Sequence, residues 1–334
     1  MAVHAIGGYY TLLDLLRAMD PGNGQLLFVA ETLARRNPIV REVPIIEANQ
    51  ALTHIGSRQN SLPTVQKRAI NDGVTKSAHK EIPVTAPMSL FEAMSQVDEE
   101  ILRLAGGNAA GLRQQKDKAF VEAMAQSVAD EIFFGSVADD VLGFNGLTTM
   151  FNSLSTYPNG DSSWFYNVLS AGGTGGCTSV WIVEWGPEKA HLIYPKNTQG
   201  GIEIVDLGKQ LVDGTTTGEF VAYVTQFKWR CGLYVQDERC VQRLANIERT
   251  GAANLWNDDD MIDLMNRLPE MGESPNTRIY CNRAIRTQMD IRLKDKNNVN
   301  YTATADPFGI PVMRFRGIPV QVCDALNAAE DDVA

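Results

Sequence analysis

Two glycine-rich stretches could bind phosphate if a lysine followed them. Residues 172–176 (Gly-Gly-Thr-Gly-Gly) precede neither a Lys-Ser/Thr pair nor a helical pattern. A phosphate-binding loop needs both, because the lysine reaches the phosphates and backbone N–H groups cradle them. Residues 106–111 have the four-residue glycine gap of such a loop, but Leu112-Arg113 stands where the Lys-Ser/Thr pair belongs. We therefore expect a flexible loop at 172–176 and a helix start at 106–111.

Neighbouring carboxylates at 98–100, 139–140 and 258–260 could do acid–base chemistry. Such catalysis needs two carboxyls in one pocket with separated pKa values, whereas adjacent acids in polar segments are usually helix caps or solvated. The cluster at 258–260 lacks the glycine and glutamate of a calcium loop, and no Gly-x-Ser-x-Gly motif occurs. We predict no catalytic residue, although a site assembled from distant residues stays open.

The cysteines and histidines show no metal-ligand spacing. The 5 cysteines form no Cys-x-x-Cys pair, and the 4 histidines form no His-Glu-x-x-His motif. We predict no metal or cofactor site and expect the cysteines to be buried thiols.

Composition and charge limit the class of protein. With 334 residues, 44% hydrophobic and 21% charged, the chain can bury a large core. The net charge of -10 argues against a protein that coats nucleic acid by neutralising phosphates. Neither a long apolar run nor a secretory signal is visible, so we expect no membrane contact and synthesis in the cytoplasm.

Residues 43–90 form a segment with few large apolar residues. Strand-like pieces are expected at 43–46, 51–58 and 65–70, with a turn at 71–73. A two-stranded ribbon is marginal alone in water and needs a sheet or a partner to lie on. The segment is also locally basic, so we expect it to lie on an acidic helix face of a neighbouring subunit, with a solvated loop as the alternative. The inter-subunit contact candidates are Arg58, Lys67, Arg68, Lys76, Lys80, Glu122, Asp130 and Glu131.

The strongest helical pattern runs from Ala109 to Phe134 and stops at Gly135. Residues 91–104 before it are also helical in pattern. Residues 151–247 are mainly strand-like, and helices are expected at 258–267 and 283–293. Strands are expected at 277–281, 311–315 and 319–323. Short helices near 10–19 and 25–36 complete an α+β pattern.

Several of these segments resemble those of the Hong Kong 97-type phage major capsid proteins. Residues 120–135 (FVEAMAQSVADEIFFG), followed by 143–147 (GFNGL), resemble the spine helix and its exit loop. Three further matches follow in the same order as in the family. They are 234–247 (YVQDERCVQRLANI), 278–283 (RIYCNR) and 309–320 (GIPVMRFRGIPV). The chain looks closest to the capsid proteins of short-tailed phages.

The resemblance implies a Hong Kong 97-type fold of five parts. These are an N-terminal arm (1–42), an extended β loop (43–90), a peripheral domain with the spine helix 109–134 (91–150), a mainly axial domain (151–275), and a helix with closing strands (276–334). Hexamers and pentamers of the chain would form an icosahedral head enclosing double-stranded DNA without sequence-specific binding. Scaffold, portal and cementing proteins are the expected partners, and assembly would occur in the host cytoplasm to give a virion component.

Two alternatives stay open. An encapsulin-like compartment shell shares the implied fold and would differ in holding enzyme cargo. A soluble hydrolase with dispersed catalytic residues would need a concave pocket in a monomer or small oligomer.

Overall fold

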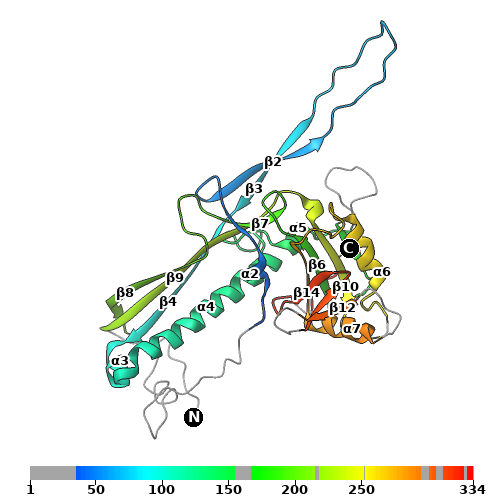
Figure 1. The fold of residues 1–334 in the computed structure, drawn as a ribbon. Coiled ribbons are helices and arrows are strands. Elements are labelled where there is room, and N and C mark those ends of the chain that lie inside the picture. The colour runs from blue at the N-terminus through cyan, green and yellow to red at the C-terminus, as the bar shows by residue number, and fades with distance from the viewer. Residues whose placement is uncertain are drawn as a thin grey trace. The chain divides into compact units, whose positions relative to one another are not determined.

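The computed structural model of the protein describes residues 35–154, 167–214, 218–251, 253–294, 301–305, 311–326 and 329–333. The described chain divides into two compact units (Figure 1). The first contains Leu90–Val128 and Gln199–Arg230, and the second contains Arg36–Ser89, Ala129–Thr198 and the chain from Cys231 onward. The expected helices near 10–19 and 25–36 lie outside the described residues, except for the end of the second.

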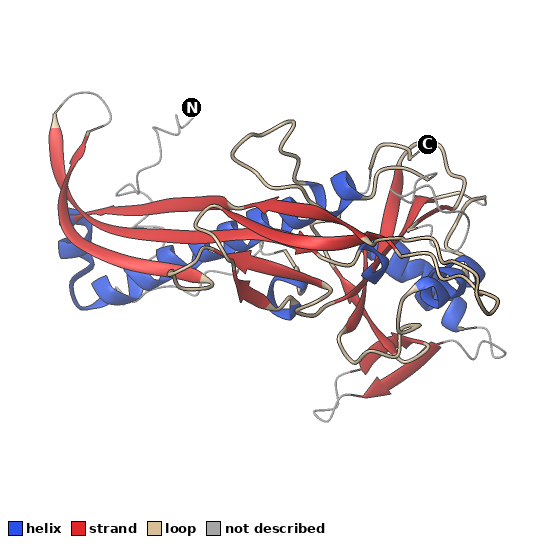
Figure 2. Ribbon diagram, turned by 90° about the horizontal axis from the view of Figure 1, so that it is seen from above, coloured by secondary structure: helices blue, strands red, loops and turns tan. Residues whose placement is uncertain are grey.

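A long helix and long strands build the first unit. Helix α4 (Ala109–Phe134) has the bounds expected from the sequence and spans about 40 Å at about 1.5 Å per residue. Its last residues belong to the second unit. The other elements are β4 (Ser89–Asp98), α3 (Glu99–Ala105), the 3-10 turn η1 (Gly106–Asn108), β8 (Ile202–Asp213) and β9 (Glu219–Val235). Figure 2 shows the long strands running alongside the helix.

Apolar packing joins this helix to the sheet. Strand β8 pairs with β9 from Ile202↔Trp229 to Asp213↔Glu219, and β4 lies on the other side of β9. The Phe120 ring on α4 stacks on Phe227 of β9, with 5.7 Å between ring centroids. Leu112 is fully buried in a cluster with Val97 and Leu102. Contacts of Leu112 and Phe120 with other apolar side chains of the first unit therefore hold this part of the long helix in place.

A seven-stranded sheet carries the larger core of the second unit. Its strand order is β12-β13-β14-β11-β6-β10-β5. Helices α6 (Asp258–Arg267) and α7 (Arg283–Leu293) add Met261 and Met289 to the same core as Ile182 and Phe315. The strands are β5 (Val168–Ser170), β6 (Cys177–Glu184), β10 (Val241–Glu248), β11 (Thr277–Cys281), β12 (Tyr301–Ala305), β13 (Pro311–Phe315) and β14 (Ile318–Val322).

The second unit also contains the smaller elements around a two-stranded ribbon. Strand β1 (Ile45–Glu47) pairs in parallel with β7 (Ala190–Tyr194), which pairs with the end of β9. The ribbon consists of β2 (Thr53–Ser61) and β3 (Lys80–Pro87). The remaining short elements are α2 (Ile39–Glu42), α5 (Leu147–Met150) and the 3-10 turn η2 (Glu238–Cys240).

Buried polar bonds fix the end of the chain to the main sheet. The Arg243 guanidinium, 1% exposed, pairs with the Glu330 carboxylate at 2.9 Å, and Ser179 Oγ donates to the same carboxylate at 2.5 Å. The Asn246 side chain accepts from the Val333 N–H at 2.9 Å and donates to the Val333 carbonyl at 2.8 Å. Residues 329–333 are thereby part of the folded unit.

Several local expectations are wrong. Residues 91–104 are not one helix, because 89–98 form β4 and only 99–105 are helical. Residues 65–70 form no strand. Strands β8 and β12 had no specific prediction. Helix α6 begins at Asp258 as expected, but the Asn257 side chain caps it, while Asp258 accepts from Trp256 Nε1 and Tyr301 OH in the interior.

Candidate functional site

The β2–β3 ribbon and the segment that joins its strands, residues 53–87, form the candidate site, which we call the extended loop. The strands are antiparallel, with register from Thr53↔Pro87 to Ser61↔Lys80 and one irregularity after Gln59. The 9 residues of β2 at about 3.3 Å each give a ribbon about 30 Å long. Residues 62–79 beyond the strands carry no helix or strand, and we call them the tip.

Arg58 fixes the base of the extended loop within the chain. Its Nε donates to the Gln236 carbonyl at 2.9 Å and its Nη2 to the Val235 carbonyl at 3.1 Å. The guanidinium also pairs with the Glu238 carboxylate. Three donors to one short segment make a directional contact, because the guanidinium is planar. The structure therefore uses this inter-subunit candidate as an anchor inside its own subunit.

A second contact at the base joins β2 to Tyr234. The His54 ring meets the Tyr234 ring edge-on, with 4.5 Å between centroids, and the His191 ring lies 5.3 Å from the same tyrosine. Gly56 lies against the tyrosine hydroxyl, where an added Cβ would come within 1.8 Å of the oxygen. Burial lowers the pKa of both histidines; for His191 the hydrogen bond with the Gly186 carbonyl opposes this effect, and the nearby His54 imidazole adds to it. The base is therefore closely packed, and this packing disfavours the charged form of both imidazoles.

Polar bonds hold the two sides of the tip together. The Thr64 N–H donates to Ser77 Oγ at 3.0 Å, and that hydroxyl donates to the Thr64 carbonyl at 3.1 Å. Farther out, Arg68 Nη1 donates to the Asp72 carbonyl at 3.1 Å across the turn. Asn71 has a φ of 68° there, a backbone conformation that asparagine tolerates. The tip therefore has local order without a strand ladder.

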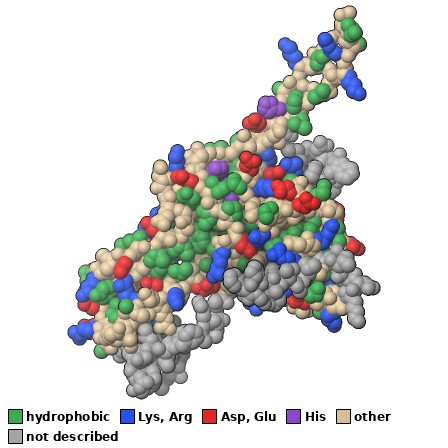
Figure 3. Space-filling model, viewed as in Figure 1, with side chains coloured by type: hydrophobic (Ala, Val, Ile, Leu, Met, Phe, Trp, Pro, Cys, Tyr) green, Lys and Arg blue, Asp and Glu red, His purple; other side chains and the backbone are tan. Residues whose placement is uncertain are grey.

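Every residue of the tip is solvent-exposed. Four aliphatic side chains on it are exposed by 55% to 93%: Leu62, Val65, Ile70 and Val74. Lys67, Lys76 and Lys80 have no ion pair within the described part of the chain. Figure 3 shows basic and hydrophobic side chains together at the far end of the loop. The sequence-based interpretation used only the basic residues and assigned Val65 and Ile70 to a strand.

The acidic candidates lie along α4. The Glu122 carboxylate accepts from Gln126 Nε2 at 3.0 Å, one turn along the helix. Asp130 is half-buried. The Glu131 carboxylate accepts from the Phe144 N–H at 3.0 Å. Burial raises the pKa of Glu131, the Phe144 bond lowers it, and nearby Asp140 raises it. Glu131 therefore stabilises the exit of the helix from inside the subunit.

Close backbone packing explains the glycines after α4. A Cβ on Gly135 would lie 2.3 Å from the Phe144 carbonyl oxygen, and one on Gly146 would lie 2.6 Å from the Glu131 carbonyl oxygen. The Gly146 N–H donates to the Gly135 carbonyl at 2.8 Å. Only glycine fits both positions without moving the backbone. These contacts therefore hold the backbone of residues 135–146 tightly against the end of α4.

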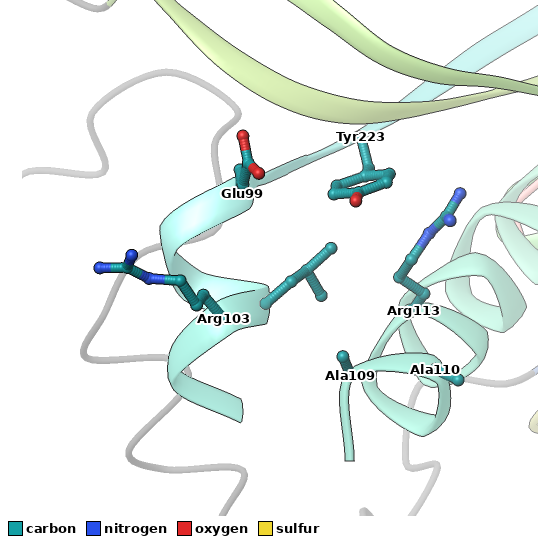
Figure 4. Close-up of a pocket in the computed structure, with 7 residues that line it drawn as sticks. Glu99, Arg103, Ala109, Ala110, Arg113 and Tyr223 are labelled. Atoms are coloured by element: carbon teal, nitrogen blue, oxygen red, sulfur yellow. The ribbon is translucent and has the colours of Figure 1, made fainter. Parts of the chain in front are cut away.

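The first unit contains a pocket of about 400 Å³ (Figure 4). It is lined by Glu99, Leu102, Arg103, Ala109, Ala110, Arg113 and Tyr223. Arg113 is held by Asp206 at 2.9 Å and Thr225 at 3.1 Å, and Lys209 pairs with Glu99. These seven residues include no serine, cysteine or histidine, and their charged groups form ion pairs. The lining therefore offers no nucleophile with a base beside it.

The structure also locates the residues considered above for metal binding, thiol chemistry and phosphate binding. Among the described residues, no three His, Cys, Asp or Glu side chains gather as a metal site, and no helix is long and apolar enough to cross a bilayer. All 5 cysteines are free and buried, as expected. Residues 172–176 form a loop without a following helix, and η1 and the start of α4 occupy 106–111.

Comparison with known proteins adds a family to this geometry. A family model described as major capsid protein GP7 matches residues 21–334. A cryo-EM structure of bacteriophage Epsilon15 matches with a TM-score of 0.67 and 22% identity, over 99% of this chain and 100% of that one. The bacteriophage JBD30 capsid matches with a TM-score of 0.52 and 13% identity, over 89% and 93%. No curated protein sequence matches the chain.

The exposed tip, the anchored base and the long helix with the turn after it are parts of one architecture, which this chain shares with the matched capsid structures. The structural matches establish that this architecture is the α+β Hong Kong 97-type capsid fold. The family model covers nearly the whole chain. The chain therefore belongs to the major capsid protein GP7 family, whose members build the shells of tailed phages.

Proposed function

We propose that this capsid protein forms hexamers and pentamers of an icosahedral head around double-stranded DNA, and that its extended loop lies across a neighbouring copy. The observation that carries the loop contact is the difference in bonding along residues 53–87. Arg58 and Tyr234 fix the base inside the subunit. The tip keeps aliphatic and basic side chains in solvent. Exposed aliphatic groups on an ordered projection are typical of an interaction site.

The proposed division of labour follows the parts of the chain. Residues 1–42 serve as an arm, 43–90 as the extended loop, and 91–150 as the peripheral domain. Residues 151–275 form mainly the axial domain around the centre of each capsomer, and 276–334 close the sheet. The separate extended loop in this division is supported by the pairing of β2 with β3 alone, outside the seven-stranded sheet.

The proposed contact is basic on one side and acidic on the other. Lys67, Arg68, Lys76 and Lys80 face an acidic surface of the neighbouring copy, for which Glu122, Asp130 and Glu131 are the candidates on α4. Among these, Glu131 is already hydrogen-bonded within its subunit, and Arg58 has the anchoring role described above. Head-to-tail contacts of this kind generate closed rings when the rotation between copies closes.

Other partners follow from the role of a shell. We propose that scaffold, portal and cementing proteins assemble with this chain in the host cytoplasm. The net charge of -10 suits a container wall, because like charge keeps packaged DNA from adhering. A structural, non-enzymatic role agrees with the capsid family and with the paired charges in the pocket lining. No observation favours the compartment-shell or hydrolase alternative.

The assembly proposal is tested by expressing the chain with its neighbouring genes and imaging the product by negative-stain electron microscopy. Closed particles are expected with the unmodified chain. The double variant Lys67→Glu/Arg68→Glu should lower particle yield and change its salt dependence. Lys196→Glu/Lys294→Glu is the control, because both lysines are exposed and the change in net charge is equal. Equal yield and salt dependence in the two variants would refute the loop contact, and a monomer under every condition would refute assembly itself.

A further inference from the structure

The turn that follows α4 exposes two large aliphatic side chains. Residues 136–143, which we call the exit turn, carry Val141 and Leu142 at 83% and 82% exposure. Asp139 and Asp140 precede them and are also exposed. Large aliphatic side chains in adjacent positions with most of their surface in water are unfavourable, so this surface needs an explanation.

Hydrogen bonds fix the backbone of the exit turn in the conformation that exposes these side chains. The Asp140 carboxylate accepts from the Leu142 N–H at 2.9 Å, and the Gly143 N–H donates to the Asp140 carbonyl at 3.0 Å. The Val137 N–H donates to Asn145 Oδ1 at 3.0 Å. A turn fixed in this way loses little conformational freedom when a partner binds.

The tip of the extended loop has the complementary character. Its aliphatic side chains include Val65 and Ile70, exposed by 93% and 92%, and Lys67 and Arg68 lie between them in the sequence. The exit turn joins an exposed aliphatic pair to an acidic pair, and the tip joins exposed aliphatics to a basic pair. Aliphatic contact at the centre with opposite charges at the rim is the usual arrangement of a protein interface.

We propose that the tip of one copy docks on the exit turn of the neighbouring copy, with Val65 and Ile70 covering Val141 and Leu142. Lys67 and Arg68 then lie beside Asp139 and Asp140. This inference rests on the proposed loop contact and names its acceptor as the exit turn rather than the face of α4. The partner is a second copy, because tip and exit turn are both exposed within one chain.

Exchanging the charges of the tip and of the exit turn tests whether the exit turn accepts the tip. The tip variant is Lys67→Glu/Arg68→Glu. The turn variant is Asp139→Lys/Asp140→Asn, because asparagine keeps the oxygen that accepts from Leu142. Each variant alone should lower particle yield by about tenfold or more, which is the effect of a modest loss of contact energy. The two variants together should recover most of that yield.

Combining the tip variant with a charge variant on α4 separates two questions: whether the exit turn is the acceptor, and whether the loop contacts a neighbouring copy at all. Glu122→Lys/Glu188→Gln changes the net charge by the same amount as the turn variant, at half-buried Glu122 on α4 and at exposed Glu188 elsewhere. If the tip variant lowers the yield and this combination restores it while the turn variant does not, the exit turn is the wrong acceptor and the loop contact stands. If the tip variant has no effect, both proposals fail.

Cysteine trapping gives a second, direct measurement. Val65→Cys/Val141→Cys should form disulfide-linked oligomers when assembled particles are oxidised, because a disulfide requires its two Cβ atoms to lie within about 4.5 Å. The native thiols are all buried and do not interfere. Val65→Cys/Met271→Cys, which places the second thiol at another exposed apolar position, should give monomers only. Monomers from both pairs would overturn the proposed docking.

Discussion

The base and the tip of the extended loop differ in where their contacts lie. At the base, Arg58 bonds to Val235, Gln236 and Glu238, and Gly56 lies against Tyr234. At the tip, bonds such as that between Thr64 and Ser77 fix only the local shape. The base therefore sets the direction of the loop within one subunit, and the tip keeps its apolar and basic surface for another. Variants at the two ends should separate subunit stability from assembly.

The largest effect on subunit stability is expected from Gly56→Ala. The new Cβ would lie 1.8 Å from the Tyr234 hydroxyl oxygen and 2.9 Å from its ring, so the strand or the tyrosine must move. Overpacking of this kind costs about 1–3 kcal/mol. Denaturant unfolding of the unassembled subunit measures the loss. Gly73→Ala in the tip is the control, because a Cβ there meets nothing within 4 Å. Equal stability of the two variants would contradict a packed base.

A somewhat smaller loss is expected from Arg58→Gln. The substitution removes the pairing with Glu238 and leaves the Val235 and Gln236 carbonyls without their donors. Lost hydrogen bonds to a partly buried charged group cost about 1–2 kcal/mol. Arg68→Gln, which removes only a bond within the tip, should leave the unfolding free energy unchanged. If Arg68→Gln lowered the unfolding free energy more than Arg58→Gln, Arg58 would not be the anchor.

A still smaller effect should depend on pH. Burial lowers the pKa of His54 and His191 below 6.5, so the unfolded chain binds more protons as pH falls through that value. Stability from these groups is present above pH 6.5, falls below it, and levels off once pH passes the lowered native pKa values. His54→Gln should flatten this part of the profile measured by unfolding at each pH.

Two features make the pH experiment specific. Burial raises the pKa of Glu42 and Glu184, and these carboxyls act with the opposite sign, so each variant is compared with the unmodified chain at every pH. His79→Gln is the matched control, since the His79 side chain is 58% exposed beyond the base. If His79→Gln flattens the profile as much as His54→Gln, the packed histidines are not responsible.

The smallest effect on subunit stability is expected from Val65→Ser/Ile70→Ser. Both side chains are over 90% exposed, and surface substitutions usually change unfolding free energy by less than about 0.5 kcal/mol. Particle yield should nevertheless fall, because the lost apolar surface belongs to a contact between copies. Ile291→Ser, at an exposed position on α7, should alter neither quantity. If the tip variant lost subunit stability but kept its particle yield, the tip would serve the subunit rather than the contact between copies.

Local patterns predicted the helices well and the strands less well. Helices α4, α6 and α7 have the expected bounds, because their apolar spacing and their terminal residues agree. Residues 89–98 contain helix-favouring leucine, alanine and methionine, yet they alternate in burial as β4 beside β9. Pairing with another strand overrides weak propensity, and the alternation of Phe91, Ala93 and Val97 with polar Glu92, Gln96 and Asp98 was the local signal that the helical interpretation missed.

The candidate site was only partly predictable. The basic residues of the loop were visible because charge can be counted in a window. The role of Arg58 depends on carbonyls nearly 180 residues later in the chain, and that of Glu131 depends on a backbone N–H after a turn. Likewise, Arg243 and Glu330 meet only in the folded unit. Such contacts depend on tertiary structure and have no local signal.

Because the native thiols are buried, a cysteine introduced at the surface of the shell can be labelled selectively. Burial raises the pKa of Cys240 and Cys281 to about 12, so very little reactive thiolate exists there at neutral pH. Cys177, Cys231 and Cys323 are buried as well, with their pKa values also raised. A fluorophore or affinity tag carried by a maleimide would therefore react with a single cysteine introduced at the tip. Its reactivity would then report, copy by copy, whether each loop in a growing head is free or covered.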